Sequence, residues 1–143
     1  MPDSGEGDPD LLVDTSVAVA LTVGDHEHHQ ATSEAVGGRR LGLAGHAAFE
    51  AFSVLTRLPA PVRRTPAVVA RVLAVGFPAT RFLSAGEAAA LLARLDGVGI
   101  AGGSVYDALV GAAALQHGCT LGTRDRRALD TYRRLDVEVE LLG

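Results

Sequence analysis

The chain has 143 residues, 48% hydrophobic but only 4% aromatic, which is enough for one domain with an aliphatic core and leaves no apolar run of the roughly 20 residues that cross a bilayer. Its net charge of −4 comes from acids within residues 1–10, because the remaining 13 acidic residues balance 13 basic ones, all arginine. The absence of lysine excludes P-loop, Schiff-base and receiver-type phosphorylation chemistry. With a single cysteine, Cys119, no internal disulfide can form, so we expect a cytoplasmic protein.

The first ten residues differ in composition from the rest of the chain. The segment MPDSGEGDPD contains four acids and lacks the basic-then-apolar pattern of a secretion signal. We therefore predict a disordered acidic tail at residues 1–10 and one folded domain at residues 11–143.

Short apolar strands alternate with helices in the first half of the domain. Residues 11–13 form an apolar strand that ends at Asp14, and Thr15 or Ser16 can cap the helix that follows, up to Leu21. The pattern then predicts a helix at 26–36 closed by glycines, a strand at 41–43, and a helix at 46–58 that prolines end.

The middle section begins with Thr65 followed by Pro66, a pattern typical of a helix start. The helix that it opens, residues 66–77, is apolar on nearly all sides. We therefore expect this helix to be deeply buried or covered by another chain. A strand at 81–83 and a helix at 84–95, which begins with a capping-box pattern, follow it.

The last third of the chain repeats the alternation of helix and strand. Residues 104–117 follow a helical period, and Gly118 closes this helix. Residues 119–121 are apolar, as a buried parallel strand would be, and a helix follows at 126–135. In residues 137–141 apolar side chains alternate with glutamates, which suits an edge strand. The whole order predicts an α/β fold with a parallel sheet between helical layers.

Four acids lie at the ends of these elements or on their surfaces. Asp14 ends the first strand, Asp125 follows a later strand, Asp107 lies near the start of a helix, and Glu50 lies within one. Because the carboxyl ends of parallel strands meet at one edge of a sheet, side chains there can converge. Mg²⁺ and Mn²⁺ prefer carboxylate oxygens, and a bound ion can activate a water and stabilise charge on a phosphate.

Each acid also has a purely structural interpretation, which spacing alone leaves open. Asp14 could simply end a strand, Asp107 could belong to a capping box, and Asp125 could cap the next helix. Glu50 could lie on a solvated stripe with the other polar residues of its helix.

The four acids lie in motifs that resemble those of the PIN-domain ribonucleases, most closely the toxins of VapBC-type toxin–antitoxin pairs. The motifs are LVDTSV at 12–17, HAAFEAFSVL at 46–55, VYDAL at 105–109 and TRDR at 123–126. They occur in the order of the family, and the resemblance covers about residues 11–142, with the section at about 59–100 the least characteristic.

The resemblance implies a PIN-like three-layer α/β/α sandwich with a central parallel β-sheet, and Mg²⁺- or Mn²⁺-dependent endonucleolytic cleavage of RNA. By the same likeness, Asp14, Asp107 and Asp125 would hold the metal, and Glu50 would complete the acidic pocket as the fourth catalytic residue. The side chains expected to hydrogen-bond these carboxylates are Thr15, Ser16 and Thr123.

The resemblance also implies a homodimer and a cognate VapB-like antitoxin whose C-terminal segment blocks the site. The helix at 66–77 is our candidate for part of that docking surface. Candidates for contacts with RNA phosphates are Arg39, Arg40, Arg63, Arg64, Arg124, Arg126 and Arg127. The alternative functions are a catalytically silent PIN-fold module that binds RNA or antitoxin, and another phosphohydrolase on a similar sheet; the four intact acids argue against the first, and the lack of lysine against the second.

Overall fold

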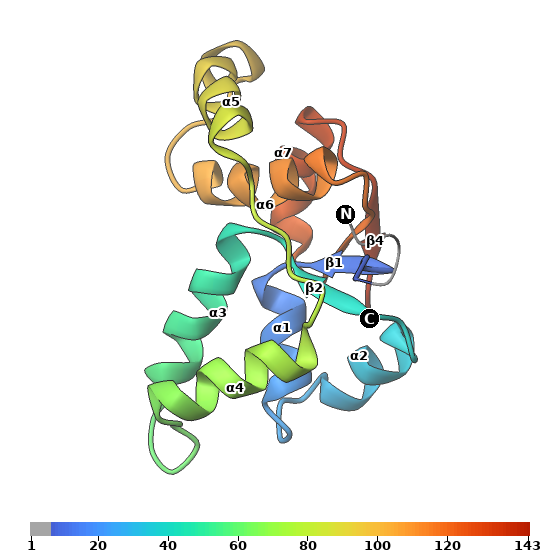
Figure 1. Ribbon diagram of the computed structural model, residues 1–143, viewed down its shortest axis with the longest axis vertical. Coiled ribbons are helices and arrows are strands. Elements are labelled where there is room, and N and C mark those ends of the chain that lie inside the picture. Colours follow the sequence, from blue (N-terminus) through green and yellow to red (C-terminus); the bar gives the residue numbers. More distant parts are fainter. Residues whose placement is uncertain (1–6) are drawn as a thin grey trace.

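Four short strands form one parallel sheet at the centre of the computed structural model, which describes residues 7–143 (Figure 1). In the register, Leu12 lies between Gly42 and Leu121 of the neighbouring strands. The strands, in the spatial order β2-β1-β3-β4, are β1 (Leu11–Val13), β2 (Leu41–Leu43), β3 (Leu121–Thr123) and β4 (Val139–Leu141). The strand order changes direction between β1 and β3, and open parallel sheets bind ligands beyond the carboxyl ends of the strands at such a point.

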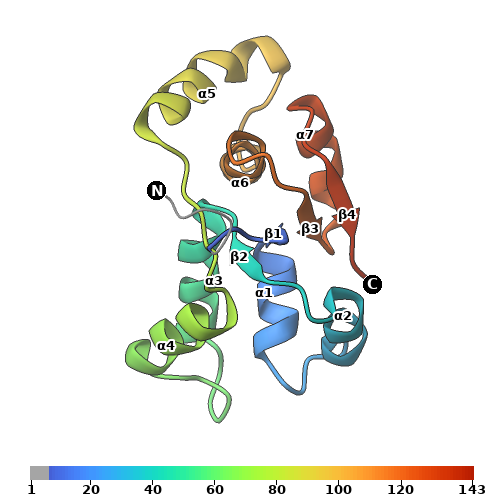
Figure 2. The ribbon, with the colours of Figure 1, turned by 45° about the vertical axis from the view of Figure 1, so that its right-hand side comes forward.

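Helices cover both faces of the sheet. On one side lie α1 (Thr15–Thr22), α2 (His29–Val36), α3 (His46–Thr56) and α4 (Pro66–Gly76); on the other lie α5 (Ala85–Val98), α6 (Ser104–Gln116) and α7 (Leu129–Arg134), which the short 3₁₀ helix η1 (Arg126–Ala128) precedes (Figure 2). The predicted three-layer α/β/α architecture is confirmed. Within the described part of the chain, no helix is long and apolar enough to cross a membrane.

The side chains of β1 divide between two hydrophobic cores. Leu11 and Val13 pack with residues of α1–α4, whereas Leu12 packs with residues of α5–α7. All three are fully buried. Because helices cover both faces, the strand appears in the sequence as a continuous apolar run instead of an alternating one.

Local capping signals predicted the starts of α4 and α5 correctly. Thr65 caps α4, its hydroxyl oxygen accepting from the Val68 amide at 3.3 Å, and Ser84 caps α5 in the same way through the Glu87 amide at 3.2 Å. Both helices were predicted to begin there, because these contacts span only three residues of sequence.

Other boundaries differ from the predictions. The second helix begins at His29 rather than residue 26, because the chain before it forms successive turns in which the amides of His26 and His29 donate to the carbonyls of Val23 and His26. The third strand begins at Leu121, two residues later than predicted. The predicted helix at 126–135 starts as a 3₁₀ turn before it becomes α7.

The predicted strand at 81–83 is wrong. Residues 79–81 run beside β2, but only Arg81 makes a bridge, with Ala44. The Thr80 hydroxyl takes the place of a backbone acceptor for the Leu43 amide, at 3.0 Å, so the regular ladder stops. Gly42 permits the close approach: a Cβ there would lie 2.1 Å from the Ala79 carbonyl oxygen.

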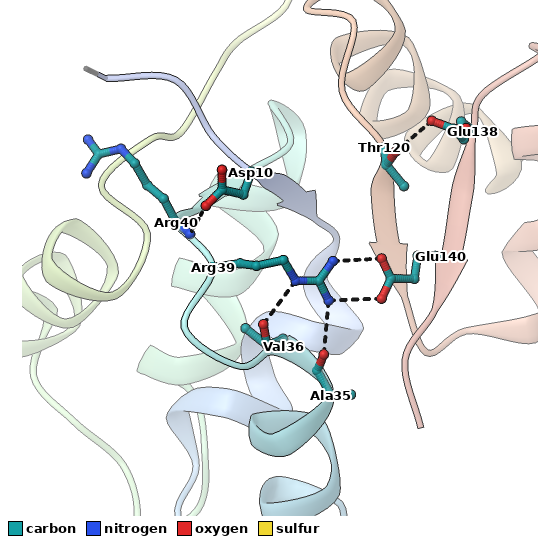
Figure 3. Close-up of polar contacts among 8 residues, drawn as sticks. All are labelled: Asp10, Ala35, Val36, Arg39, Arg40, Thr120, Glu138 and Glu140. Carbon is teal, nitrogen blue, oxygen red and sulfur yellow. Dashed lines mark hydrogen bonds and ion pairs between the residues drawn. The ribbon is translucent and has the colours of Figure 1, made fainter. Parts of the chain in front are cut away.

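Arg39 joins the end of α2 to the edge strand β4 (Figure 3). Its two terminal nitrogens donate to both carboxylate oxygens of Glu140, at 2.8 and 2.9 Å, and its guanidinium also donates to the carbonyls of Val36 and Ala35. This charged partner lowers the pKa of Glu140. Arg39 and Arg40 directly precede β2, so they lie at the amino edge of the sheet, opposite the carboxyl edge where Asp14 follows β1.

The predicted tail at residues 1–10 is described only in part, since residues 1–6 lie outside the described residues. Residues 7–10 contact the domain. The Arg40 amide donates to the Asp10 carboxylate at 2.7 Å (Figure 3), and the Arg81 guanidinium lies 3.7 Å from the Asp8 carboxylate.

Candidate active site

The fold brings the four predicted acids to one pocket. Asp14 directly follows β1, Asp125 lies two residues beyond β3, Asp107 is in the first turn of α6, and Glu50 is on α3. The pocket has a volume of about 140 Å³, and its lining residues are Asp14, Thr15, Ser16, Glu50, Asp107, Val110, Asp125 and Tyr132. It therefore lies at the carboxyl edge of the sheet, where ligands bind in this architecture.

Asp14 is the most buried of the acids, with 5% of its surface exposed. It is also the N-cap of α1, because Oδ1 accepts from the amides of Ser16 and Val17 at 3.1 and 3.4 Å, and from the Ser16 hydroxyl. The cap is therefore the acid itself, not Thr15 or Ser16 as predicted. Burial raises the pKa of Asp14, and these hydrogen bonds oppose that rise.

Hydroxyl groups tie the loops after β1 and β3 together. Thr123 Oγ1 accepts from the Asp125 amide at 3.0 Å and donates to Asp14 Oδ2. Ser16 Oγ accepts from the Arg124 amide at 2.9 Å and donates to Asp14 Oδ1. Since each hydroxyl oxygen already accepts a backbone proton, its own proton is directed to the carboxylate.

Thr15, the third side chain predicted to contact a carboxylate, bonds to Glu50 and not to Asp14. Thr15 Oγ1 donates to Glu50 Oε1 at 3.0 Å and links α1 to α3. Glu50 is half-buried and lines the pocket, whereas Ser53 and Arg57 on the same helix are exposed. The three hydroxyls thus contact carboxylates of the pocket, while the catalytic and metal-binding roles of the acids stay predictions.

The predicted capping role is confirmed for Asp125 and wrong for Asp107. Asp125 does cap η1, through the Arg127 amide at 3.0 Å, and lies 3.5 Å from Nε of the same arginine; both contacts use Oδ1. The capping box for Asp107 is wrong, because Gly103 is the N-cap of α6 and no side chain caps it. Among the described residues, Asp107 makes no hydrogen bond or ion pair, so its carboxylate is available to the pocket.

Burial and the negative charges of the pocket both raise the pKa of Asp107. Partial burial raises its pKa from 3.8 to about 6, with further contributions from the negative charges of Asp125, Glu50 and Asp14 and a small opposing effect of Arg127. Such crowded carboxylates suit a hard divalent cation in both charge and atom type, because a cation relieves their repulsion. In the structure, no three His, Cys, Asp or Glu side chains within residues 7–143 are grouped closely enough to hold one ion. Binding of an ion in the pocket would therefore require its carboxylates to move closer together.

We predict that Asp107→Asn stabilises the fold at neutral pH. Because the pKa of Asp107 is about 6 in the folded chain and 3.8 ordinarily, the folded state binds more protons between these values, and stability falls as the pH rises through that window. The variant should therefore melt at a higher temperature than the parent at neutral pH, with the gain lost below the ordinary pKa. Melting curves across this range, with the exposed Asp96→Asn as control, measure the effect. A gain independent of pH would contradict it.

Sequence reasoning missed Tyr132, which lines the pocket. It lies on α7 and donates from its hydroxyl to Asp14 Oδ2 at 2.9 Å. The spacing of Ala128, Tyr132 and Leu135 indicates the buried face of a helix, but nothing local identifies the partner of the hydroxyl.

Comparisons with known proteins agree with the fold and with the motifs. A family profile described as PIN domain matches residues 11–135. The chain is 46% identical to Ribonuclease VapC27 of Mycobacterium tuberculosis over 131 residues, covering 92% of this chain and 96% of the relative. It is 44% identical to Ribonuclease VapC40 of the same species over 134 residues, covering 92% and 98%. The crystal structure of VapBC2 from Rickettsia felis, bound to a promoter DNA fragment, is similar with a TM-score of 0.64 at 13% identity, over 93% of this chain and 98% of that one; this likeness concerns the fold alone.

Proposed function

Because the chain belongs to the PIN domain family and is a relative of the VapC ribonucleases, we propose that it is the toxin of a toxin–antitoxin pair and a metal-dependent endoribonuclease. The observation that carries the proposal is the pocket in which Asp14, Glu50, Asp107 and Asp125 meet. Ribonuclease activity is the named property of both relatives, and an acidic pocket suits the metal-assisted hydrolysis of a phosphodiester.

We propose that Asp14, Asp107 and Asp125 hold Mg²⁺ or Mn²⁺, and that Glu50 completes the pocket. A bound ion would supply Lewis acidity and a more acidic water. Ser16 and Thr123 orient the Asp14 carboxylate, and Thr15 orients that of Glu50. Asp107 and Asp125 would have to move closer to Asp14 for the three to hold one ion.

The arginines beside the pocket are the better candidates for contacts with RNA phosphates. Arg126 and Arg127 are exposed and follow Asp125 directly. Arg39 is paired with Glu140 at the opposite edge of the sheet, so we no longer propose it for this role.

RNA cleavage by the purified protein, freed of antitoxin, tests the proposal. We expect cuts at defined positions with Mg²⁺ or Mn²⁺, and none after chelation. Metal binding without cleavage of any RNA would favour the catalytically silent binding module, and absence of metal binding would refute the acidic metal site.

We further propose that the antitoxin docks beside α4 and that the toxin forms a homodimer. An apolar groove of about 460 Å³ lies between α1 and α4, lined by Leu21, Thr22, Arg71, Val72, Val75, Gly76 and Phe77. Val75 is 74% exposed on it, whereas Val69 and Leu73 are buried in the core. The helix at 66–77 therefore has one face packed within the protein and one face open to a partner. The Rickettsia felis structure is named as a VapBC assembly, which is consistent with such a partner.

Val75→Asp should weaken binding of the cognate antitoxin by about 10-fold or more, because it places a charge on apolar surface that the partner would cover. Titration of antitoxin into each protein measures this change. The matched control is Ala70→Asp, which adds the same charge to an exposed position of α4 that does not line the groove. Equal weakening by both variants would mean that the docking surface lies elsewhere.

A further inference from the structure

Tyr132 is a buried tyrosine whose ring packs closely against α6. Only 1% of its surface is exposed. Its ring packs against α6 at Gly111, where an added Cβ would lie 3.1 Å from Tyr132 Cδ1 and 3.2 Å from Val137 Cγ2. A larger residue at position 111 would therefore press on the ring.

The hydroxyl of this ring contacts Asp14, the residue that directly follows β1. It donates to Asp14 Oδ2 at 2.9 Å, and Thr123 donates to the same oxygen. Oδ1 of Asp14 meanwhile accepts from the first turn of α1. The carboxylate is thus held from three directions, by α1, by the end of β3 and by α7, which leaves it little freedom to rotate.

The two donors to Oδ2 are not equivalent. Thr123 is the last residue of β3, and the Asp125 amide in the following loop fixes its hydroxyl. Tyr132 comes from an independent element and is held by packing against Gly111. A phenol is ordinarily protonated at neutral pH, so the Tyr132 hydroxyl can donate to Asp14 Oδ2 as it does in the structure.

We propose that Tyr132 is a positioning residue of the active site, whose hydroxyl fixes the orientation in which Asp14 meets a divalent cation. This inference rests on the proposed function. A partner that orients a metal-binding carboxylate typically affects metal affinity or activity about 10- to 100-fold. In this proposal Tyr132 acts through its hydrogen bond to Asp14.

The test removes one oxygen atom at each of the two tyrosines in the chain. Tyr132→Phe keeps the buried ring and loses the hydrogen bond to Asp14, whereas Tyr106→Phe makes the same change at a side chain that is 53% exposed. Binding of Mn²⁺ without RNA is measured by calorimetry, and kcat and KM are measured on RNA. We expect Tyr132→Phe to lower the affinity for Mn²⁺ and kcat by about 10-fold with little change in KM. Tyr106→Phe should behave as the parent protein.

Unchanged affinity for Mn²⁺ and unchanged kcat in Tyr132→Phe, with a parent protein that binds and cleaves, would overturn this inference alone. A parent protein that neither binds Mn²⁺ nor cleaves RNA would overturn the proposed function and this inference with it. Gly111→Ala is a second variant in case Tyr132→Phe does not fold. It keeps the hydroxyl but crowds the ring, so it should also lower the affinity for Mn²⁺, and an unchanged affinity would count against the inference.

Discussion

Asp14→Asn is expected to slow RNA cleavage by about 1,000-fold while the fold is retained. A metal ligand and its charge contribute several kcal/mol to stabilising the transition state, and about 4 kcal/mol corresponds to about 1,000-fold in rate. The substitution keeps an oxygen that can accept from the Ser16 and Val17 amides, and asparagine caps helices as well as aspartate does. The loss should therefore be chemical rather than structural.

Cleavage by the pure proteins and their melting curves separate these two effects. Asparagine presents an amide group toward the hydroxyls of Thr123 and Tyr132, so a stability loss of about 1 to 3 kcal/mol is compatible with the expectation. Asp130→Asn, an equivalent change at a carboxylate whose side chain is 74% exposed, is the control. Near-normal cleavage by Asp14→Asn would refute the assignment of the metal site.

Gly42→Ala is expected to destabilise the protein by about 3 kcal/mol or more, since the new Cβ would overlap backbone rather than a flexible side chain. It would lie 2.1 Å from the Ala79 carbonyl oxygen and 2.7 Å from the Thr80 amide nitrogen. Hydrogen bonds from the amides of Ala79 and Arg81 to β2 hold this segment in place on both sides, so it cannot move away without breaking them.

Thermal melting measures this loss, and a destabilisation of about 3 kcal/mol corresponds to a fall of about 10 °C for a domain of this size. The control is Gly38→Ala, where an added Cβ meets nothing within 4 Å. It should leave the melting temperature unchanged or slightly raised, because alanine restricts the unfolded chain. If both variants melt at the same temperature, the close approach at Gly42 does not constrain the fold.

Features of the fold that depend on near neighbours were predictable from the sequence. The strand at Leu11–Val13 is a continuous apolar run because both of its faces are covered. The starts of α4 and α5 are set by Thr65 and Ser84, which bond to amides three residues away. The end of the regular ladder at Arg81 was not predictable, because it depends on the Thr80 side chain meeting β2, 37 residues earlier.

The same distinction applies to the candidate site. The convergence of the four acids follows from parallel strands, whose carboxyl ends share one edge. The contact of Tyr132 with Asp14 spans 118 residues, and no local pattern of α7 reveals it. The cap at Asp14 was missed for a different reason: the hydroxyls of Thr15 and Ser16 are equally good caps by residue type, and only the geometry shows that they bond to carboxylates instead.

Because the donors to Asp14 Oδ2 lie near the end of the chain, the pocket cannot form until most of the chain has been translated. The donors, Thr123 and Tyr132, are separated from Asp14 by 109 and 118 residues. The fourth acid, Asp125, is translated after Thr123 and before Tyr132. At about 5–20 residues per second, a ribosome needs on the order of 6 to 24 seconds to cover that interval. A nascent chain therefore carries its first acid long before it has the partners that fix it, and a truncated chain that ends before β3 lacks the assembled site altogether.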